Sequence, residues 1–327
     1  TGEPSFTHNW LVNSKHKISK LILQARELNK FHGTFLSSIM RYQINGRIHA
    51  EINQLRSDQG GTVSGRLSMG NPNLQQIPAR NKDFGPKIRS LFIPEEGHQW
   101  GSFDYSQQEP RMTVHYAASI GEGYEGSQEL VDAYKNASAD FHQTVADLVG
   151  IERTQAKTIG LGLMYGMGKN KLANSLGLTK DEAEILISKY NRKVPFVKLL
   201  SEKCMLTAQD KGVIRTKRGR KCRFDQWETK DFGLHLPETF DNAVAKYGRD
   251  NIKRAKTYKA LNRLIQGSSA DQTKQAMVDC YNAGHLPILQ IHDELCFNVK
   301  DKEDISTIKK TMEECIEFKV PFVVDHG

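Results

Sequence analysis

The sequence contains little cysteine and no long hydrophobic run. Its five cysteines are odd in number and form no CxxC pair, which argues against a zinc site or a disulfide framework and predicts reduced thiols in a cytosolic setting. No apolar run approaches the roughly 18 residues that a membrane-spanning helix requires. Internal repeats and low-complexity segments are also absent. A chain of 327 residues, 38% hydrophobic and 26% charged, is therefore expected to be an ordinary soluble globular protein, large enough for more than one domain.

Positive charge is in moderate excess and is locally concentrated. The formal net charge is +8, and the segment KGVIRTKRGRKCR, residues 211–223, holds seven basic residues in thirteen. Such a run often forms a solvated loop without a ligand. Together with the polyanion-binding signals described below, however, it favours contact with a phosphate backbone.

The spacing of apolar residues predicts a mixture of helices and antiparallel strands. An amphipathic pattern predicts a helix over residues 14–31 with Ser14 as its N-cap, and Asn45-Gly46 between two strand-like segments is typical of a tight hairpin. Residues 56–80, rich in Gly, Ser, Asn and Pro, are expected to form an ordered loop. Residues 225–250 are expected to be irregular. Further helices are predicted over most of residues 127–210, 251–283 and 302–317. This order of elements predicts an α+β fold.

Two aspartates lie in apolar, strand-like segments where a lone carboxylate is unexpected. Asp104 belongs to QWGSFDYSQQEPR, residues 99–111, and Asp293 to LQIHDELCFNV, residues 289–299, whose odd positions are otherwise apolar. A buried carboxylate costs several kcal/mol unless a cation or hydrogen bonds compensate it. Two of them brought together would supply oxygen ligands for a divalent cation such as magnesium. Taken singly, Asp104 could instead cap a helix and Asp293 could lie in a turn.

The segment RTQAKTIGLGLMYG, residues 153–166, places two cations and an aromatic ring on one side of a predicted helix. Residues four apart drift by only about 40° around a helix, so a single face carries Arg153, Lys157, Leu161 and Tyr165. That order suits a nucleoside triphosphate, with its phosphates on the two cations and its base toward the ring. Considered alone, the segment could also be a solvated helix with scattered Lys and Arg.

Five segments occur in the order and relative spacing of motifs of the A-family DNA polymerases, the relatives of bacterial DNA polymerase I and of podophage replicative polymerases. DYSQQEPR, RTQAKTIGLGLMYG and QIHDELCF resemble motifs A, B and C of that family. TVSGRLSMGNPNLQQIPAR, residues 62–80, and LNRLIQGSSAD, residues 261–271, resemble two further elements. The resemblance implies a right-hand polymerase fold: a palm with an antiparallel sheet, largely helical fingers and a reduced thumb.

The resemblance implies a two-metal catalytic site. Asp104 and Asp293 would hold two magnesium ions, for which manganese could substitute, with the main-chain carbonyl of Tyr105 as a further ligand. One metal would activate the primer 3′-hydroxyl, and the other would neutralise the triphosphate and the leaving pyrophosphate. Glu294 would support this site, although a solvent-facing acid in a turn is its alternative. Lys157 would donate a proton to pyrophosphate.

The resemblance also implies contacts with substrates. The positions that match nucleotide-binding residues are Arg153, Lys157, His142, Leu161, Tyr165, Gly166, Glu109 and Gln107. Within this set, Glu109 matches the steric-gate acid that disfavours ribonucleotides, and Tyr165 and Gly166 match the templating position. The positions that match contacts with the minor groove or primer terminus are Arg66, Asn73, Gln75, Gln107, Asn262, Gln266 and His292. Such contacts need no sequence preference, because minor-groove acceptors are shared by all base pairs. For any one amide, a hydrogen bond within its own loop is the alternative.

The sequence departs from the family pattern at several places. Pro110 stands where bacterial members have leucine, a residue that a first helical turn tolerates. Leu161 stands where Phe or Tyr is common. The segment between His142 and Arg153 is short, as in phage members, and the chain ends short of the family's usual terminus.

The resemblance implies four regions: a thumb remnant and the start of the palm (1–60), palm with motif A (61–125), fingers with motif B (126–255) and palm with motif C (256–327). Nothing before residue 10 resembles an exonuclease, so no exonuclease domain is expected in this chain. The first residues, Thr-Gly-Glu-Pro, lack an initiator methionine and a leader pattern and predict a fragment or processed product.

The implied function is template-directed DNA synthesis from dNTPs on primer–template DNA. We expect a monomer in the cytoplasm, the host cytoplasm if the source is viral, with a replisome or processivity partner as an open question and no membrane partner. Two alternatives remain. A single-subunit RNA polymerase uses a similar Asp, Lys-Tyr-Gly and His-Asp arrangement, although Glu109 and the NPNLQQIP loop favour the DNA enzyme. A catalytically idle DNA-binding fragment is the alternative that is not an enzyme.

Overall fold

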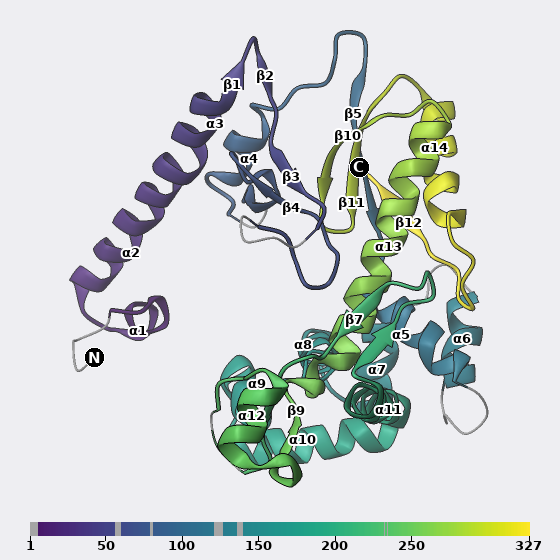
Figure 1. Ribbon diagram of the computed structural model, residues 1–327. Coiled ribbons are helices and arrows are strands. Elements are labelled where there is room, and N and C mark those ends of the chain that lie inside the picture. Colours follow the sequence, from purple (N-terminus) through teal and green to yellow (C-terminus); the bar gives the residue numbers. More distant parts are fainter. Residues whose placement is uncertain are drawn as a thin grey trace. The chain divides into compact units, whose positions relative to one another are not determined.

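The computed structural model describes residues 6–55, 60–78, 81–120, 127–135, 140–231, 233 and 235–327. Within these ranges the chain combines helices with antiparallel strands, which confirms the α+β class (Figure 1). It divides into two compact units, residues 1–61 with 67–96 and residues 62–66 with 97–327. The four-region division stays a prediction. The first residues, Thr-Gly-Glu-Pro, and the end of the 62–80 loop, Ala79 and Arg80, lie outside the described ranges.

The first unit begins with helices α1 (His8–Asn13) and α2 (Lys17–Lys30), a π-helical segment η1 (Phe31–Leu36) and α3 (Ser37–Tyr42). The predicted helix over 14–31 is confirmed, but its N-cap is His16 rather than Ser14: the His16 ring nitrogen Nδ1 accepts a hydrogen bond from the Ile18 amide at 3.3 Å. The reason is that Ser14 is the C-cap of α1, and its amide donates to the carbonyls of Trp10 and Leu11.

A short hairpin, a second antiparallel strand pair and two short helices complete this unit. Strands β1 (Gln43–Ile44) and β2 (Arg47–Ile48) flank Asn45-Gly46, whose φ angles of 50° and 78° confirm the predicted tight turn. Strand β3 (Glu51–Asn53) pairs with β4 (Ser68–Gly70), followed by the 3-10 helix η2 (Leu74–Gln76) and α4 (Gly85–Arg89). A small core of Phe35, Ile39 and Ile88 holds the unit together.

The second unit is built on a four-stranded antiparallel sheet. Its order is β10 (Pro287–Ile291), β11 (Glu294–Val299), β5 (Gln99–Tyr105) and β12 (Val324–His326). Along β5, Gly101, Phe103 and Tyr105 point into the core, and a side chain at Gly101 would collide with Phe103 and Val299 at 2.9 Å. Helices α5 (Gln108–Ser119), α13 (Ala260–Asn282) and α14 (Lys302–Glu314) contribute to the same core, and α13 and α14 run alongside the sheet in Figure 1. The opposite, more open face of β5 carries the half-buried Trp100 and Ser102 and the exposed Asp104.

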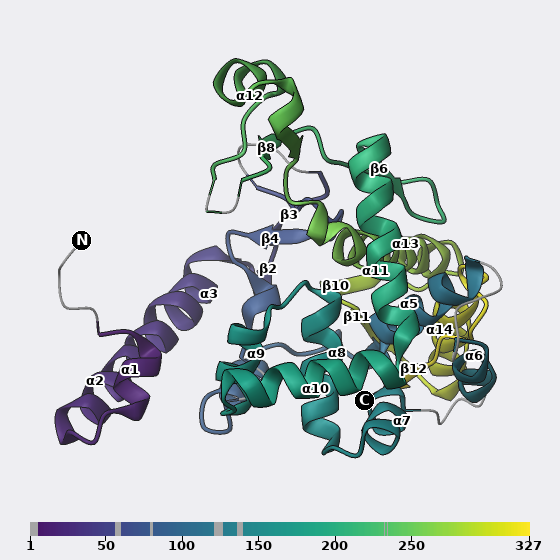
Figure 2. The ribbon, with the colours of Figure 1, turned by 90° about the horizontal axis from the view of Figure 1, so that it is seen from below.

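Within the described parts of residues 127–211, six helices follow α5, and they confirm the helical prediction for most of residues 127–210. They are α6 (Ser127–Lys135), α7 (Phe141–Val149), α8 (Arg153–Met164), α9 (Lys169–Leu176), α10 (Lys180–Lys193) and α11 (Pro195–Lys211). Capping boxes start two of them, through Glu152 and Gln155 at α8 and through Thr179 and Glu182 at α10. Figure 2 shows α8 and α10 side by side, on the face of this unit seen from below.

The segment before α13 is more ordered than its sequence indicates. Strand β6 (Val213–Arg215) pairs with β7 (Lys221–Arg223), and β8 (Trp227–Thr229) pairs with β9 (Ile252–Arg254) around α12 (Phe240–Tyr247) and η3 (Arg249–Asn251). The expectation that residues 225–250 are irregular is therefore wrong. The helix expected from 251 begins only at Ala260, after β9 and the 3-10 helix η4 (Thr257–Lys259). An aromatic cluster orders this segment. Phe240 contacts the Trp227 ring, and the Arg254 guanidinium lies over the same Trp227 ring, 4.6 Å from its centroid.

Candidate active site

Three carboxylates lie side by side on the open face of the main sheet. In its register, Asp104 on β5 is the cross-strand partner of Glu294 on β11 and of Asp325 on β12. Residues directly opposite each other in antiparallel strands have Cβ atoms about 4.5–5.5 Å apart. The Ser102 hydroxyl donates a hydrogen bond to Glu294 and holds it on this face. The predicted burial of Asp104 is wrong, because its neighbours Phe103 and Tyr105 take the core side and leave Asp104 exposed.

Asp293 adds a fourth carboxylate from the turn between β10 and β11. The expected strand position is corrected: His292 and Asp293 form the turn itself, with His292 at φ 60°. The main-chain carbonyl of Asp293 accepts a hydrogen bond from the Tyr105 amide at 3.4 Å, which fixes the turn against the end of β5. The two aspartates singled out by the sequence are thus brought to the same end of the sheet.

The crowding of these acids changes their ionisation. Although Asp104 lies on the exposed side of β5, the surrounding chain removes part of its hydration, and this effect first and the negative charges of Asp293, Glu294 and Asp325 second raise its pKa to about 7. Burial also raises the pKa of Asp293, while Arg66 opposes the shift. Opposed like charges destabilise a sheet unless something neutralises them, and carboxylate oxygens are the ligands of hard divalent cations. The residues present therefore fit a magnesium ion.

Side chains alone do not complete such a centre. Across the described ranges, no group of three or more His, Cys, Asp or Glu side chains is arranged to hold a metal by itself. At Tyr105 only the main chain is available, because its buried hydroxyl donates to the Met312 carbonyl at 2.6 Å. Two aspartates and one carbonyl would leave positions for substrate oxygens, as a catalytic metal requires.

A second cluster surrounds the carboxylate of Glu109. Helix α5 begins at Gln108, so Pro110 lies in its first turn as expected. One Glu109 oxygen accepts a hydrogen bond from Arg66 Nη2 at 2.5 Å, and the other accepts from the Tyr165 hydroxyl. Burial and the negative charge of Glu109 raise the pKa of Tyr165. A hydrogen bond with Gln266 opposes this rise. Glu109, on α5, is therefore bonded to the 62–66 segment through Arg66 and to the end of α8 through Tyr165. Tyr165 in turn contacts α13 through Gln266.

Helix α8 carries the predicted row of nucleotide-binding residues. Arg153 and Lys157 are exposed, Leu161 is half-buried against the core, and Tyr165 is 39% exposed. Arg153 forms an ion pair with Asp140, the N-cap of α7, with 2.6 Å between Nη2 and Oδ2. Burial alone would raise the pKa of Asp140, but the hydrogen bond from Arg153 and the helix amides outweigh it and lower the pKa.

Two of the predicted nucleotide-binding side chains face the protein interior: His142 is buried, and Gln107 is hydrogen-bonded to α6 and α7. His142 lies in the interior, where burial lowers its pKa to about 4, and its Nδ1 has no hydrogen-bond partner among the described residues. Gln107 adopts a left-handed backbone with φ 54°. Its side-chain oxygen accepts hydrogen bonds from the Phe141 amide at 2.9 Å and from the Tyr134 hydroxyl at 3.3 Å, so it holds the start of α7.

The predicted DNA contacts fall into two groups. Arg66, Asn262, Gln266 and His292 belong to the second unit, with Asn262 and Gln266 one turn apart on α13. Asn73 and Gln75 belong to the first unit and bond within their own loop: Asn73 caps η2 by accepting from the Gln75 amide at 3.1 Å, and Gln75 donates to the Leu67 carbonyl at 3.4 Å.

Sequence reasoning missed two residues at this site. Asp325 joins the acidic row only because β12 pairs with β5, and no local pattern specifies that pairing. Tyr258 on η4 is exposed and packs on Gly166, where a side chain would lie 3.2 Å from its ring. The φ of +71° at Gly166 also favours glycine. A hint lay in the sequence KRAKTYKA, where basic residues surround one aromatic residue.

The family model of DNA polymerase family A matches residues 2–327. The chain belongs to this family. It is 37% identical over 371 residues to a DNA-directed DNA polymerase of Pseudomonas phage M6, an alignment that covers 99% of this chain and 52% of the phage protein. It is 32% identical to DNA polymerase I of Lactococcus lactis subsp. cremoris, with 93% of this chain and 33% of that protein covered. The predicted resemblance to phage-type members is confirmed.

A solved structure supports the family A fold. The chain matches the structure described as the POL domain of Pol1 from M. smegmatis in complex with DNA primer-template and dNTP, with a TM-score of 0.78 and 26% identity. The match covers 98% of this chain and 54% of that chain. The chain thus spans about half the length of its phage relatives and a third of the Lactococcus enzyme. No helix in the described ranges is long and apolar enough to cross a membrane, and all five cysteines are free thiols.

Proposed function

We propose that this chain is the core of a template-directed DNA polymerase, which adds dNTPs to the 3′-hydroxyl of a primer annealed to template DNA. The observation that carries the proposal is the meeting of Asp104 with Glu294 and Asp293 at one end of an open sheet face. These carboxylates come from segments that resemble motifs A and C. The M. smegmatis domain, whose title names DNA primer-template and dNTP, supports this choice of substrates.

The acidic cluster would hold two magnesium ions through Asp104, Asp293 and the Tyr105 carbonyl, and manganese could replace them. When bound, these ions supply activation of the primer hydroxyl and neutralisation of the developing charge on pyrophosphate. Glu294, held by Ser102, would stay outside the ligand set and keep the local potential negative.

The exposed face of α8 would receive the triphosphate. Lys157 would contact the phosphates and donate a proton from Nζ to the leaving pyrophosphate. Arg153 would exchange its Asp140 partner for phosphate oxygens, since a guanidinium binds both groups in the same bidentate manner. His142, neutral and buried beneath this face, would offer its unpartnered Nδ1 for a hydrogen bond once the helix moves.

The cluster around Glu109 would select the sugar and place the template base. Glu109 would crowd the 2′ position and reject ribonucleotides, with Arg66 and Tyr165 fixing its carboxylate. Leu161 would lie beside the 3′ position. Tyr165 and Gly166 would border the templating base. The minor groove and primer terminus would contact Arg66, Asn73, Gln75, Gln107, Asn262, Gln266 and His292.

The four-region organisation with a reduced thumb, a monomeric state and a cytoplasmic location belong to the same proposal, whereas a processivity partner stays a question for experiment. The decisive test is extension of a labelled primer on a DNA template with Mg²⁺, run in parallel with dNTPs and rNTPs. Template-directed extension with dNTPs is expected. Preferential rNTP incorporation would support the RNA polymerase alternative. Binding of DNA without extension would support the catalytically idle one.

A further inference from the structure

Tyr258 is an exposed aromatic side chain at the border of the proposed templating position. It belongs to η4 and is 53% exposed. Its ring lies against Gly166, where a side chain would come within 3.2 Å of ring carbon Cδ2 and within 3.5 Å of the Tyr258 carbonyl oxygen. A large aromatic surface is thus open to solvent directly beside the residue that would border the template base.

The turn that presents Tyr258 is anchored to α11. Gln209 donates from Nε2 to the Thr257 hydroxyl at 2.8 Å and to the Arg254 carbonyl at 3.0 Å. Its Oε1 accepts a hydrogen bond from the Arg254 amide at 3.1 Å. Thr257 is buried, whereas the next residue, Tyr258, is exposed. The ring is therefore held outward by a fixed backbone, as a preorganised binding surface requires.

Basic residues flank Tyr258 on both sides, in KRAKTYKA, residues 253–260. Lys253 pairs with Glu228 at 3.9 Å, whereas Lys256 and Lys259 form no ion pair with any described carboxylate. Lys259 Nζ lies 5.6 Å from the centroid of the Tyr258 ring. Proteins bind single-stranded nucleic acid through this combination, in which a base stacks on an aromatic ring and cations contact the phosphates of the strand.

Tyr258 also continues a row of predicted DNA contacts. Gln266 and Asn262 lie one turn apart on α13, and Tyr258 precedes Asn262 by a further four positions. Gln266 hydrogen-bonds to Tyr165, and Tyr258 contacts Gly166. Both ends of the row therefore meet the end of α8, where the template base would lie.

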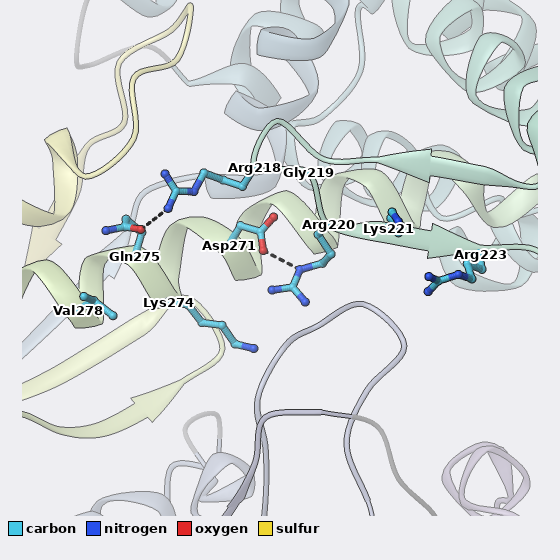
Figure 3. A pocket seen from close by; sticks show the side chains of 9 residues that line it. All are labelled: Arg218, Gly219, Arg220, Lys221, Arg223, Asp271, Lys274, Gln275 and Val278. Atoms are coloured by element: carbon cyan, nitrogen blue, oxygen red, sulfur yellow. Dashed lines mark hydrogen bonds and ion pairs between the residues drawn. The ribbon is translucent and has the colours of Figure 1, made fainter.

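A basic pocket further along α13 differs from Tyr258 in its chemistry. It has a volume of about 660 Å³ and lies between the β6–β7 hairpin and residues of α13 that all follow Gln266 (Figure 3). Five Lys or Arg side chains line it, which suits the phosphate contact expected of the basic run, but no aromatic ring does. Tyr258 precedes Gln266. Along this part of the chain, the ring on which a base could stack and the pocket therefore lie on opposite sides of the predicted minor-groove contacts.

We propose that Tyr258 stacks on the first unpaired template base ahead of the templating position, with Lys256 and Lys259 on the phosphates of the same strand. The inference rests on the proposed function and adds a platform for single-stranded template to it. Every base has a face that can stack, so the platform needs no sequence preference. The base of the incoming dNTP offers the same chemistry from another source.

The first test compares primer–templates whose template strand extends one or four nucleotides beyond the primer terminus. The shorter overhang supplies the templating base alone. Affinity is measured by fluorescence anisotropy without dNTP or divalent metal. We expect the wild type to gain about tenfold in affinity from the longer overhang, and Tyr258→Ala to lose most of that gain. Without any such gain in the wild type, the proposal fails.

Matched variants separate the ring from other effects of the substitution. Tyr258→Leu keeps an apolar side chain beside Gly166 but has no ring, so it should lose the gain as well, while Tyr258→Trp should retain it. Tyr281→Ala removes an exposed tyrosine from the far end of α13 and should bind like the wild type. Lys256→Gln/Lys259→Gln should reduce the log–log salt slope on the longer overhang by about one, and Lys193→Gln/Lys310→Gln, at exposed lysines elsewhere, should not.

A second measurement locates the stacked base. A single abasic residue is placed at each position of the four-nucleotide overhang in turn. The position next to the templating base should weaken binding by the wild type severalfold and have no further effect on Tyr258→Ala, because the two changes remove the same contact. If that abasic residue weakens both proteins equally, or if Tyr258→Ala and Tyr281→Ala bind the longer overhang alike, the proposal is wrong.

A third measurement separates the template from the incoming nucleotide. The affinity for the next dNTP is measured with Mg²⁺ on a dideoxy-terminated primer with the one-nucleotide overhang. A loss of dNTP affinity in Tyr258→Ala, together with an intact gain from the longer overhang, would assign the ring to the incoming nucleotide and overturn the proposal. Primer extension by the wild type is recorded in the same series. A wild type that gains affinity through Tyr258 but extends no primer would contradict the proposed function and leave the platform standing.

Discussion

Asp104 and Asp293 are 189 positions apart in the chain and meet at one end of the sheet because β5 pairs with β11. We expect Asp104→Ala or Asp293→Ala to abolish nucleotide addition and to leave the fold intact, because each substitution removes a carboxylate that the two proposed metals would share. Primer extension with Mg²⁺ measures the effect, and circular dichroism checks the fold. Asp210→Ala, at an exposed residue of α11, is the matched control. Near-native extension by either site variant would refute the metal assignment.

The proposed role of Glu109 leads to a prediction about sugar selection. Replacing it with alanine opens space for a 2′-hydroxyl, so the ratio of rNTP to dNTP incorporation should rise. Overall activity should fall as well, because Arg66 and Tyr165 lose their shared partner. Glu109→Gln keeps the volume and should retain most of the discrimination. Single-nucleotide incorporation assays give the ratio, and an unchanged ratio in Glu109→Ala would show that this residue is not the gate.

Leu161 makes a prediction about dideoxynucleotides. In the family, a Tyr at this position supplies a hydroxyl that stands in for a missing 3′-hydroxyl, which leucine cannot do; a site built around a substrate hydroxyl rejects an analogue that lacks it. The protein should therefore discriminate against ddNTPs, and Leu161→Tyr should reduce that discrimination. Leu161→Phe adds the ring without the hydroxyl and serves as the control. Equal termination by wild type and Leu161→Tyr would mean that Leu161, half-buried in the structure, only packs against the core.

At the scale of single elements, the 62–66 segment depends on Gly65. Gly65→Ala should impair primer extension severalfold, because it strains a backbone at φ +85° and pushes the Arg220 guanidinium away, which displaces the neighbouring Arg66. Gly46→Ala has a similar φ of +78° but nothing within 4 Å, so it isolates the cost of the backbone conformation. Steady-state kinetics with saturating primer–template compare the two. An equal loss of activity in Gly65→Ala and Gly46→Ala would show that the contact between Gly65 and Arg220 does not affect primer extension.

The sequence predicted elements well where a local rule governs them. Asn45-Gly46 forms the expected hairpin because only a few residues accept its positive φ angles. It failed over 225–250, where β8 and α12 depend on contacts of Trp227 with Phe240 and Arg254 rather than on periodicity. The expectation that Asp104 is buried was wrong for a similar reason: a strand-like segment does not state which alternate set of side chains faces the core.

At the scale of the whole molecule, buried histidines make stability depend on pH. Burial, and after it the positive charges of Lys217 and Lys319, lower the pKa of His115 to about 4. Because the unfolded state binds more protons, stability should be full above about pH 6.5 and fall as the pH approaches 4, with His115 costing about 2 kcal/mol at pH 5. Urea unfolding of His115→Gln from pH 5 to 8 should show a shallower loss. His32→Gln, at an exposed histidine, controls for removing an imidazole, and a slope equal to wild type in His115→Gln would contradict the assignment.

Which distant strands pair was not predictable from the residues alone. The motif segments identified Asp104, Asp293 and Glu294 through their resemblance to a family, whereas Asp325 entered the acidic row through a β12 pairing that no local signal encodes. Likewise, Arg220 and Asp271 are 51 positions apart, so the basic run was visible in the sequence but the pocket it forms with α13 was not.

The position of β5 in the sheet has a consequence for folding during translation. Both neighbours of β5 arrive late: Glu294 follows its partner Asp104 by 190 residues and Asp325 follows it by 221. At about 5–20 residues per second, synthesis of the intervening chain takes on the order of 10–40 seconds. During that interval β5 has two unpaired edges, which are templates for aggregation. The four-stranded sheet can therefore close only after nearly all of this sequence has been translated, and nascent chains should depend on chaperones that shield exposed strands.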